Sequence, residues 1–563
     1  MTPSPTADKA VGAAGLALLL IGFLVAPFWG ADFHRQETTV LFADRWIAVA
    51  TLVLLNLAAL GVLLMLRETD SGGLPAAGAV LLALAAALLL RLDTFYEAFE
   101  RDLMIYSTIA GDLLRGKLLY VDAWDIKPPA VFWTYAAAAR LYGTSPAAIW
   151  VLGLITTVGT AIACYFAGRE LGGVRGGAFA ALVWCLLSGD LVLQANQPNV
   201  ESFLNLLVAT GFYVCLKRRR NPGDVSGSLL IGALFAAATL YKQIALLVFL
   251  ALGVVMFASR MPEQPRRWRQ ELHRIGIAAA VIACGWLLTA AYFGSLGTLE
   301  PFLHFVFALG ADYAGNPGQN LVEGLDPARY RLVMAYLPLA AVSAAVLYFA
   351  RSRLDPLGPS LLAAYAVGAW LAVVLPGKFH PHYFQLLLPP LAILCGWGAG
   401  RIGIRRHLWI ALFGVALVPA LAQRMVQTWV PVDSIPIYKY GPHGIESLES
   451  RRIGQWLGKH APGSATLFHW GAEPGVHFWS GRPPAVRFIA HFPLFMDPRG
   501  ERAARIEREL VAELAAARPD LIALNTGWVG ASRSPVGNWI AQHYREATDR
   551  PQGLTRYTLL VPK

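Results

Sequence analysis

Long apolar segments separated by short polar ones fill the chain from about residue 10 to residue 425, and a more polar pattern follows. A helix needs about 20 apolar residues to cross a bilayer. The fold class is therefore predicted to be a polytopic α-helical membrane protein followed by a small soluble domain. About 13 transmembrane helices are predicted, at residues 10–30, 46–66, 73–92, 147–168, 177–194, 200–216, 227–241, 244–258, 275–293, 331–350, 358–376, 384–400 and 408–425.

Basic residues between the apolar segments predict the orientation of the helices. They form six clusters, near residues 67, 169–175, 217–220, 260–274, 351–353 and 401–406. With the predicted helices, all six fall on the side of the N-terminus, and loops rich in lysine and arginine stay cytoplasmic. The outer face is then predicted to receive residues 93–146, 195–201, 294–330 and 377–383 and the C-terminal domain.

The apolar stretch 227–258 is interrupted only by Tyr241, Lys242 and Gln243. Basic loops flank the stretch on both sides, so the number of membrane crossings between them should be even. We therefore predict a hairpin with Lys242 at its outer turn, in a cavity below the membrane surface. The alternative is one long helix with a snorkelling lysine.

The composition agrees with a membrane protein and excludes other classes. Charged residues make up 15% of the chain, against roughly 25% in soluble domains. The net charge of +11 arises largely from arginines in the loops, so it indicates topology and not a nucleic-acid partner. The five cysteines lie in apolar segments without CxxC spacing, which excludes a disulfide framework. The first apolar segment is too long for a signal-peptide core, so no cleavable signal is predicted.

The C-terminal region alternates between strand and helix patterns. Helices are predicted at residues 451–460, 501–517 and 539–544, and strands at 465–470, 485–489, 520–524 and 555–561. This alternation predicts a small α/β sandwich, which we expect to cover the cavity or to help select the acceptor. His469 and Glu473 flank a strand-to-helix turn and are either functional or ordinary loop residues.

The first outer segment combines two short apolar stretches with a polar turn. Residues 103–114 carry an apolar stripe with helical spacing, and residues 130–142 are too short to span a bilayer. We predict two interfacial helices here. Asp102 lies at the start of the first helix, and the turn between the helices contains Asp122, Asp125 and Lys127.

Other outer segments add ionisable groups, and such groups at membrane depth are often functional. Each also has a structural interpretation. Glu201 is suited to cap a helix, Asp122 and Asp125 to bond turn amides, and the histidines to anchor the interface. The additional groups are Glu201, Lys242, Lys378, His380, His382 and Tyr383.

The order and spacing of these residues resemble a known enzyme family. The first outer segment contains Asp102-x3-Tyr106-x3-Ala110, Tyr120-x-Asp122 and Trp124-Asp125-x-Lys127-Pro128-Pro129. Three later segments, 197–201, 241–243 and 378–383, follow in the family's order. The arrangement resembles the GT-C glycosyltransferases, especially bacterial relatives of the dolichyl-phosphate-mannose protein mannosyltransferases and the lipid A aminoarabinose transferase. It covers most of residues 75–425.

The resemblance implies a polyprenyl-phosphate sugar donor, a hydroxyl acceptor and a location in the bacterial inner (plasma) membrane with a periplasmic site. Asp102 matches the family's general base, and one base without a covalent intermediate implies inversion. Cations near the leaving phosphate would stabilise its charge. The substrate-binding candidates are Tyr106, Asp122, Asp125, Lys127, Glu201, Lys242, Lys378, His380, His382 and Tyr383. The predicted domains are two extra helices in 1–72, a GT-C-like module in 73–425 and an extracytoplasmic α/β domain in 426–563.

One departure from the family affects the metal prediction. Many relatives carry an Asp-Glu pair where this chain has Asp102 and Leu103. Either Glu100 or Glu201 replaces the second acid, or one acid is enough. The sequence establishes no cofactor with certainty, and a divalent metal is possible, with His380, His382 and Glu201 as its ligands. A His-x-His pair is equally suited to bind phosphate.

Competing functions remain open at this point. A lipid-linked glycan transporter should show internal repeats, and none is visible. A polysaccharide ligase or polymerase would have a similar layout. The acceptor is a lipid, a polysaccharide or a protein, and membrane lipids are the other partners. The outer segment 294–330 is positioned to act as a lid.

Overall fold

The computed structural model describes residues 80–563 except 82–83, 86, 88–90, 92–95, 220–223, 261–264, 354, 356, 403–405, 492–500 and 527–533. The chain divides into two compact units. The helical unit comprises Met1–Phe95, Trp150–Ala291 and Ala314–Val430, and the mixed unit comprises Tyr96–Ile149, Tyr292–Tyr313 and Pro431–Lys563. The predicted N-terminal domain 1–72, with its helices 10–30 and 46–66, and most of the predicted helix 73–92 lie outside the described residues.

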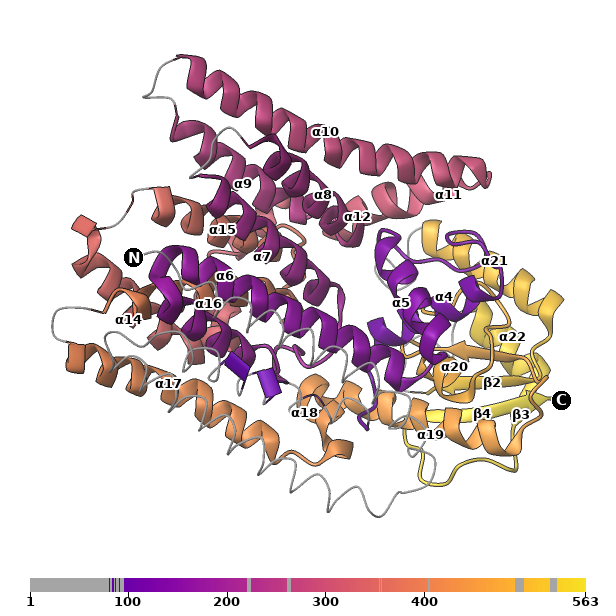
Figure 1. The fold of residues 1–563 in the computed structure, drawn as a ribbon. Helices are drawn as coiled ribbons and strands as arrows, with labels where there is room; N and C mark the ends of the chain where they lie inside the picture. The colour runs from indigo at the N-terminus through magenta and orange to yellow at the C-terminus, as the bar shows by residue number, and fades with distance from the viewer. Residues whose placement is uncertain are drawn as a thin grey trace. The chain divides into compact units, whose positions relative to one another are not determined.

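Long apolar helices form the helical unit (Figure 1). Among the described residues, seven helices are long and apolar enough to cross a membrane, and two more, α8 and α9, are shorter. The prediction of a polytopic helical membrane protein is therefore confirmed. The helices are α6 Pro146–Leu187, α7 Val200–Arg218, α8 Val225–Tyr241, α9 Ala245–Ala258, α10 Pro265–Ser295, α13 Pro317–Glu323, α14 Leu337–Phe349, α15 Leu357–Val374, α16 Leu388–Gly400 and α17 Arg406–Thr428, with 3₁₀ helices at Pro327–Tyr336 and Pro381–Leu387.

Two predicted helices merge in α6, which is kinked at Gly173 (φ 73°). Around the kink, α6 approaches α16 closely. A Cβ on Gly176 would lie 2.9 Å from the carbonyl oxygen of Gly396, and one on Gly172 would lie 3.2 Å from Cα of Trp397. Small residues allow such close helix packing in membrane proteins.

The end predicted for the second of these helices, residue 194, is wrong because α6 ends at Leu187. Asp190 in the following turn accepts hydrogen bonds from Gln423 Nε2 (2.8 Å) and Gln427 Nε2 (2.7 Å). It also accepts one from the backbone N–H of Val192 (2.8 Å). An aspartate that bonds its own backbone favours a turn over a continued helix.

The predicted hairpin at residues 227–258 is confirmed. Lys242 ends α8 in an extended conformation (φ −161°, ψ 123°), and α9 begins at Ala245. In Figure 1, α8 packs beside α7, and α9 beside α15. The connection places Lys242 at the turn between two packed helices.

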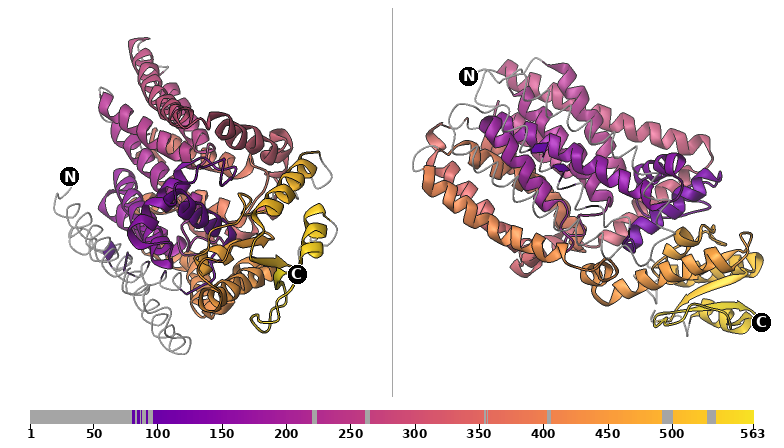
Figure 2. Two further views of the ribbon diagram at one scale, coloured as in Figure 1. Left: turned by 90° about the vertical axis from the view of Figure 1, so that its right-hand side faces the viewer. Right: turned by 60° about the horizontal axis from the view of Figure 1, so that its bottom comes forward.

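The mixed unit joins short helices to a four-stranded sheet. The strands are β1 Leu467–Trp470, β2 Leu521–Asn525, β3 Tyr544–Glu546 and β4 Tyr557–Pro562, in the order β1-β2-β4-β3. β1 and β2 are parallel, with Leu467 opposite Leu521, and β4 is antiparallel to β2 and β3. The C-terminus follows β4 at the sheet (Figure 2). The helices are α4 Arg101–Leu114, α5 Ala130–Tyr142, α11 Leu299–Leu303, α12 Gly310–Ala314, α18 Ile435–Tyr440, α19 Gly444–His460, α20 Gly475–Ser480, α21 Glu501–Ala517 and α22 Pro535–His543.

One predicted strand of this unit is wrong and one strand was not predicted. Residues 485–489 form no strand, and the preceding Pro484 makes only an isolated bridge with Leu467. Proline lacks the N–H group that a strand ladder needs, so the two prolines at 483–484 stop the pairing. The strand that was not predicted, β3, lies beside β4 at the opposite edge of the sheet from β1.

Residues from three distant regions of the sequence share one core in the mixed unit. Trp124 from the turn after α4 and Leu309 from the π-helix His304–Leu309 pack with Phe468 and Trp470 of β1. The ring of Tyr120 lies 5.7 Å from that of Phe302. The beginning of the segment predicted as a lid, residues 294–330, therefore contributes to this core.

Candidate active site

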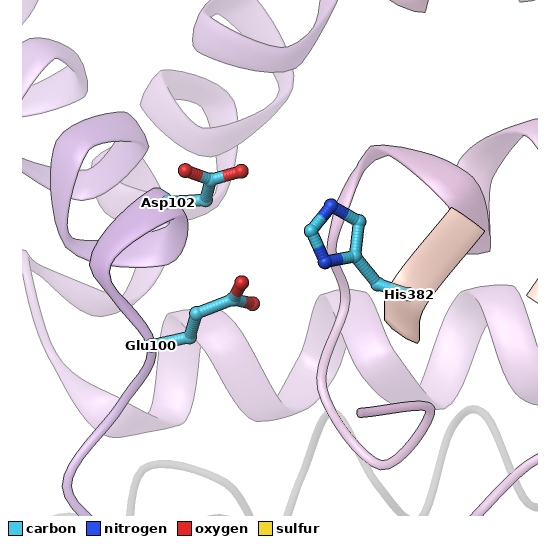
Figure 3. Close-up of side chains that lie close together, drawn as sticks. All are labelled: Glu100, Asp102 and His382. Atoms are coloured by element: carbon cyan, nitrogen blue, oxygen red, sulfur yellow. The ribbon is translucent and has the colours of Figure 1, made fainter. Parts of the chain in front are cut away.

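Asp102 lies in the first turn of α4, two residues after Glu100. Glu100 is extended (φ −63°, ψ 150°) and precedes the helix. The two carboxylates project from the same side of the chain (Figure 3), and the histidine also drawn there, His382, belongs to the helical unit. A carboxylate in the first turn is favoured by the helix dipole, by about 0.3–1 kcal/mol at exposed positions. The Asp102 side chain is 14% exposed.

Lys127 pairs with two acids in the mixed unit. Its Nζ lies 3.6 Å from Asp102 Oδ2 and 3.7 Å from Asp125 Oδ1. Its side chain is 17% exposed, and that of Asp125 is 3% exposed. Arg101 Nε also lies 4.0 Å from Asp102 Oδ1, so two cations face the two acids.

Tyr106 lies one helical turn after Asp102 and contacts its carboxylate. The Tyr106 hydroxyl lies 3.4 Å from Asp102 Oδ2, as residues four apart on a helix can. The tyrosine ring is fully buried against Phe132 of α5, at a centroid distance of 5.9 Å. Lys127 Nζ lies 5.1 Å from the same ring, within range of a cation–π interaction. Asp102, Tyr106, Asp125 and Lys127 are called the Asp102 cluster below.

The turn between α4 and α5 places Lys127 in this cluster. Tyr120 has a left-handed backbone (φ 69°), and its hydroxyl donates to the carbonyl oxygen of Lys127 at 2.8 Å. Asp122 accepts from the backbone N–H of Leu118 at 2.7 Å and is exposed. Asp122 therefore shapes the turn, in agreement with its structural interpretation.

Asp125 is nearly buried, with 5% of its surface exposed. It accepts the backbone N–H of Lys127 at 2.9 Å. Burial raises the pKa of its carboxyl group, and the charge and N–H of Lys127 oppose that shift. Asp125 therefore lies in the least water-like environment of the acids in the cluster.

A second charged group lies in the helical unit. Lys242 Nζ donates to Glu201 Oε1 at 2.7 Å and lies 3.6 Å from the centroid of the Tyr383 ring. Glu201 is in the first turn of α7, and its side chain is 1% exposed. Next to the pair, Tyr241 stacks on Phe203 at 4.8 Å. The lysine is thus fixed by a buried acid and by an aromatic face.

His382 adjoins this pair through Tyr383, with a ring distance of 4.9 Å. Its Nδ1 lies 3.0 Å from Gln194 Oε1, and His380 stacks on it at 5.5 Å. Glu201, Lys242, His382 and Tyr383 are called the Glu201 cluster below.

The predicted metal ligands do not form a set. Among the described residues, Glu201, His380 and His382 do not bring three ligand atoms together at metal-binding distance. Glu201 is paired with Lys242 instead. Lys378 is exposed in the turn before the 3₁₀ helix Pro381–Leu387.

The structure thus gathers eight of the predicted residues into two clusters, one in each unit. The prediction that both clusters serve one pocket stays a prediction. The sequence analysis did not identify Gln194, whose backbone carbonyl and side chain bind Gln385 and His382. Its left-handed backbone (φ 55°) has no sequence signal, although the polar run 194–199 marks the segment.

Comparisons with known proteins agree with this architecture. Residues 126–288 match the family model of dolichyl-phosphate-mannose-protein mannosyltransferase. The crystal structure of ArnT from Cupriavidus metallidurans bound to undecaprenyl phosphate is 14% identical, with 86% of this chain and 98% of that chain covered and a TM-score of 0.57. The apo state of ArnT gives the same values. An oligosaccharyltransferase of Archaeoglobus fulgidus is 12% identical, with 85% and 74% covered and a TM-score of 0.48. None of the curated proteins matches this chain.

The family model lies over the Lys-Pro-Pro turn and the helices that follow it, where the resemblance in sequence is also found. The fold of this chain matches that of ArnT over almost the whole length of ArnT. Over residues 126–288 this chain is similar to the dolichyl-phosphate-mannose-protein mannosyltransferases, and its fold is similar to that of ArnT.

Proposed function

We propose that this protein transfers a sugar from a polyprenyl-phosphate donor to a hydroxyl acceptor at the outer face of the bacterial inner membrane. The acceptor oxygen attacks the anomeric carbon from the side opposite the phosphate, so the configuration inverts. The bond between that carbon and the phosphate oxygen breaks, and the electron pair leaves with the polyprenyl phosphate. The proton of the acceptor hydroxyl passes to Asp102.

The environment of Asp102 carries this proposal. Its carboxylate is partly exposed at the start of a helix, and Lys127 lies 3.6 Å away. The cation and the helix terminus favour the ionised form, which is the form that accepts a proton. A positioned general base typically accelerates a reaction by about 10²–10⁴-fold.

We assign Lys242 to the phosphate of the donor. A phosphate that leaves gains negative charge, and a cation already fixed in place stabilises it without reorganisation. Glu201 at 2.7 Å and the ring of Tyr383 at 3.6 Å restrict the lysine, whose side chain remains 17% exposed. His382 is the neighbouring group that can donate a further hydrogen bond.

The class of donor is inferred from the relatives. The matched family is described by dolichyl-phosphate-mannose, and the ArnT structure contains undecaprenyl phosphate. Both are polyprenyl phosphates, which supports the same class of carrier here. The acceptor is a hydroxyl group of a lipid, a polysaccharide or a protein.

The test compares Asp102→Asn with wild type in purified full-length protein. Undecaprenyl phosphate carrying radiolabelled mannose or aminoarabinose serves as donor, and solubilised bacterial envelope as acceptor. We expect the variant to lose about 10²–10⁴-fold in turnover. Asp433→Asn is the matched control, because Asp433 is an exposed acid that pairs with Arg451 on the surface of the same unit. Full activity of Asp102→Asn would remove the base assignment.

Two further readouts separate the proposal from its alternatives. The anomeric configuration of the product, measured by nuclear magnetic resonance, should be opposite to that of the donor. A retained configuration would contradict direct displacement. If the wild type moves the labelled lipid across vesicle membranes without forming a glycosylated product, the transporter alternative replaces the enzyme.

A further inference from the structure

The segment that leads into α4 is held by the C-terminal region of the mixed unit. Residues 96–100 form neither helix nor strand, so contacts with other elements set the path by which the chain enters α4. Phe99 is buried, and its ring stacks on that of Trp479 at a centroid distance of 5.5 Å. The same ring meets Phe478 edge-on at 5.8 Å. Both partners belong to α20, which also packs against α4 itself.

A buried ion pair fixes the same segment. Lys439 lies in the last turn of α18, and its Nζ donates to Glu97 Oε2 at 3.1 Å. Both side chains are 0% exposed. Removing two charges from water costs free energy, which only a close contact between the charges offsets. A movement of Glu97 away from α18 is therefore unfavourable, and the pair restricts the position of the segment.

The position of this segment determines where Asp102 lies. α4 begins at Arg101, soon after Glu97, and its first backbone hydrogen bond runs from the N–H of Met104 to the carbonyl oxygen of Glu100 at 3.1 Å. Because α4 is a regular helix, a shift of its first turn moves the Asp102 carboxylate as well. A misplacement of about 1 Å caused by a distant substitution can slow an enzyme by about 10²-fold.

We propose that Lys439 is a positioning residue for sugar transfer, which holds Asp102 in place through Glu97 and the segment that leads into α4. This inference rests on the proposed role of Asp102 as the base. Lys439 binds neither donor nor acceptor and takes no proton in the reaction. The C-terminal region is then part of the scaffold of the active site, and not only a module that selects the acceptor.

The test compares Lys439→Met with wild type in the purified full-length protein, with the donor and the acceptor used for Asp102→Asn. We expect kcat to fall by about 10²-fold, because the base is misplaced. The KM for the donor should stay within about twofold of wild type, because the groups that bind the donor are unchanged. A wild-type kcat, with or without a change in KM, would overturn the proposal.

The double variant Glu97→Leu with Lys439→Met covers the case in which Lys439→Met does not fold. Replacing a buried ion pair with apolar side chains of similar volume is often neutral for stability. The double variant should therefore unfold near the temperature of wild type. Its kcat should stay low, because an apolar pair lacks the directional contact of the ion pair. A wild-type kcat in this variant would show that filling the space is sufficient, which would overturn the role of Lys439.

Glu449→Gln is the matched control. Glu449 lies on α19 of the same unit and is also buried. It accepts the backbone N–H groups of Thr555 and Tyr557 at 2.7 and 3.0 Å, so it joins α19 to the start of β4. The control should unfold at a lower temperature than wild type and keep a kcat close to that of wild type. If it slowed kcat as much as Lys439→Met does, any disturbance of this region would have the effect, and the specific role of Lys439 would be overturned.

Hydrogen exchange supplies a readout that does not depend on turnover. Local opening governs the exchange of backbone amides, so the N–H of Met104 should exchange at least about tenfold faster in both Lys439 variants than in wild type. In Glu449→Gln, the amides of β4 should be affected instead. Unchanged exchange at Met104 in both Lys439 variants would overturn the proposal. If Asp102→Asn retains turnover, the proposed function fails, whereas an inactive Asp102→Asn together with a wild-type kcat in Lys439→Met contradicts only this inference.

Discussion

The two charged clusters use the same residue types in opposite ways. In the Glu201 cluster, one lysine meets one acid at 2.7 Å, and the glutamate side chain is 1% exposed. In the Asp102 cluster, one lysine lies between two acids at 3.6 and 3.7 Å, and the aspartate of α4 is 14% exposed. The first arrangement has one short contact, and the second has several longer contacts, because Arg101 also lies 4.0 Å from Asp102.

This difference makes Lys242 and Asp102 suited to different tasks. A buried pair with a short contact restricts its members, so Lys242 is suited to present a fixed cation. A carboxylate with longer contacts can exchange its partner for a substrate hydroxyl and take up a proton, so Asp102 is suited to act as a base. In the proposed function, Asp102 acts on the acceptor hydroxyl and Lys242 on the phosphate of the donor.

The largest expected effect comes from Lys242→Met. Removing the lysine leaves the buried Glu201 carboxylate without its partner, which costs about 3–5 kcal/mol for buried pairs. We expect a lower unfolding temperature in detergent and loss of sugar transfer.

The double variant Glu201→Gln with Lys242→Met separates the two effects. Both charges are then absent, so most of the stability should return, while transfer should stay low because the donor phosphate lacks its cation. Recovery of transfer together with stability would mean that Lys242 only neutralises Glu201, and the contrast between the clusters would be lost.

Lys127→Met should have its main effect on turnover. The substitution leaves Asp102 and Asp125 without the cation between them, and we expect about 10²-fold slower transfer, equivalent to about 2.7 kcal/mol. The loss of stability should be smaller than for Lys242→Met, because the Lys127 contacts are longer and its partner Asp102 is more exposed than Glu201.

The matched control for Lys127 is Lys117→Met in the same segment. Lys117 Nζ lies 3.2 Å from Asp112, which keeps a second cation, Arg115, at 2.7 Å. Its loss should leave turnover close to wild type. Equal slowing in both variants would indicate a general effect of charge in this segment.

Sequence patterns predicted the local elements of both clusters but not their contacts. The apolar stripe at 103–114 and the short stretch 130–142 correspond to α4 and α5, since helical periodicity is a local property that can be read from the sequence. The hairpin around Lys242 followed from the charges on both sides of it. The pairing of Lys127 with Asp102 depends on the left-handed backbone of Tyr120, which no sequence pattern predicts.

Long-range packing explains the remaining differences. Lys439 lies far from Glu97 in the sequence, and their contact depends on how α18 packs in the mixed unit, so the sequence alone gave no reason to pair them. The prediction of a strand at 485–489 is wrong because it rested on the apolar pattern alone and did not take account of the prolines before it.

Asp125→Asn tests the burial of the second acid in the Asp102 cluster. The folded state raises the pKa of Asp125, so it contributes stability below its unfolded pKa and loses it as the pH rises through the folded pKa. Asparagine stays neutral and still accepts the N–H of Lys127. The free energy of unfolding of the variant relative to wild type should therefore increase from pH 4 to pH 7, by about 1.4 kcal/mol for each unit by which the pKa differs. A constant difference over this range would show that Asp125 is as well solvated as an exposed acid, and Asp122→Asn in the same turn supplies that reference.

Tyr120→Phe should have the smallest effect and tests how the turn positions Lys127. The variant removes the hydrogen bond from the Tyr120 hydroxyl to the Lys127 carbonyl oxygen, at 2.8 Å, while the buried ring stays. A neutral hydrogen bond contributes about 0.5–1.5 kcal/mol, so Tyr120→Phe and its control Tyr544→Phe should each lose that much stability. The matched variant is Tyr544→Phe, since the Tyr544 hydroxyl donates to the Pro519 carbonyl oxygen at 2.7 Å in the same unit. Only Tyr120→Phe should also slow transfer, by a few fold, because only its bond orients the lysine beside Asp102. If the two variants lose stability equally and neither slows transfer, the backbone of the turn positions Lys127 without Tyr120, and the longer contacts of the Asp102 cluster do not depend on this bond.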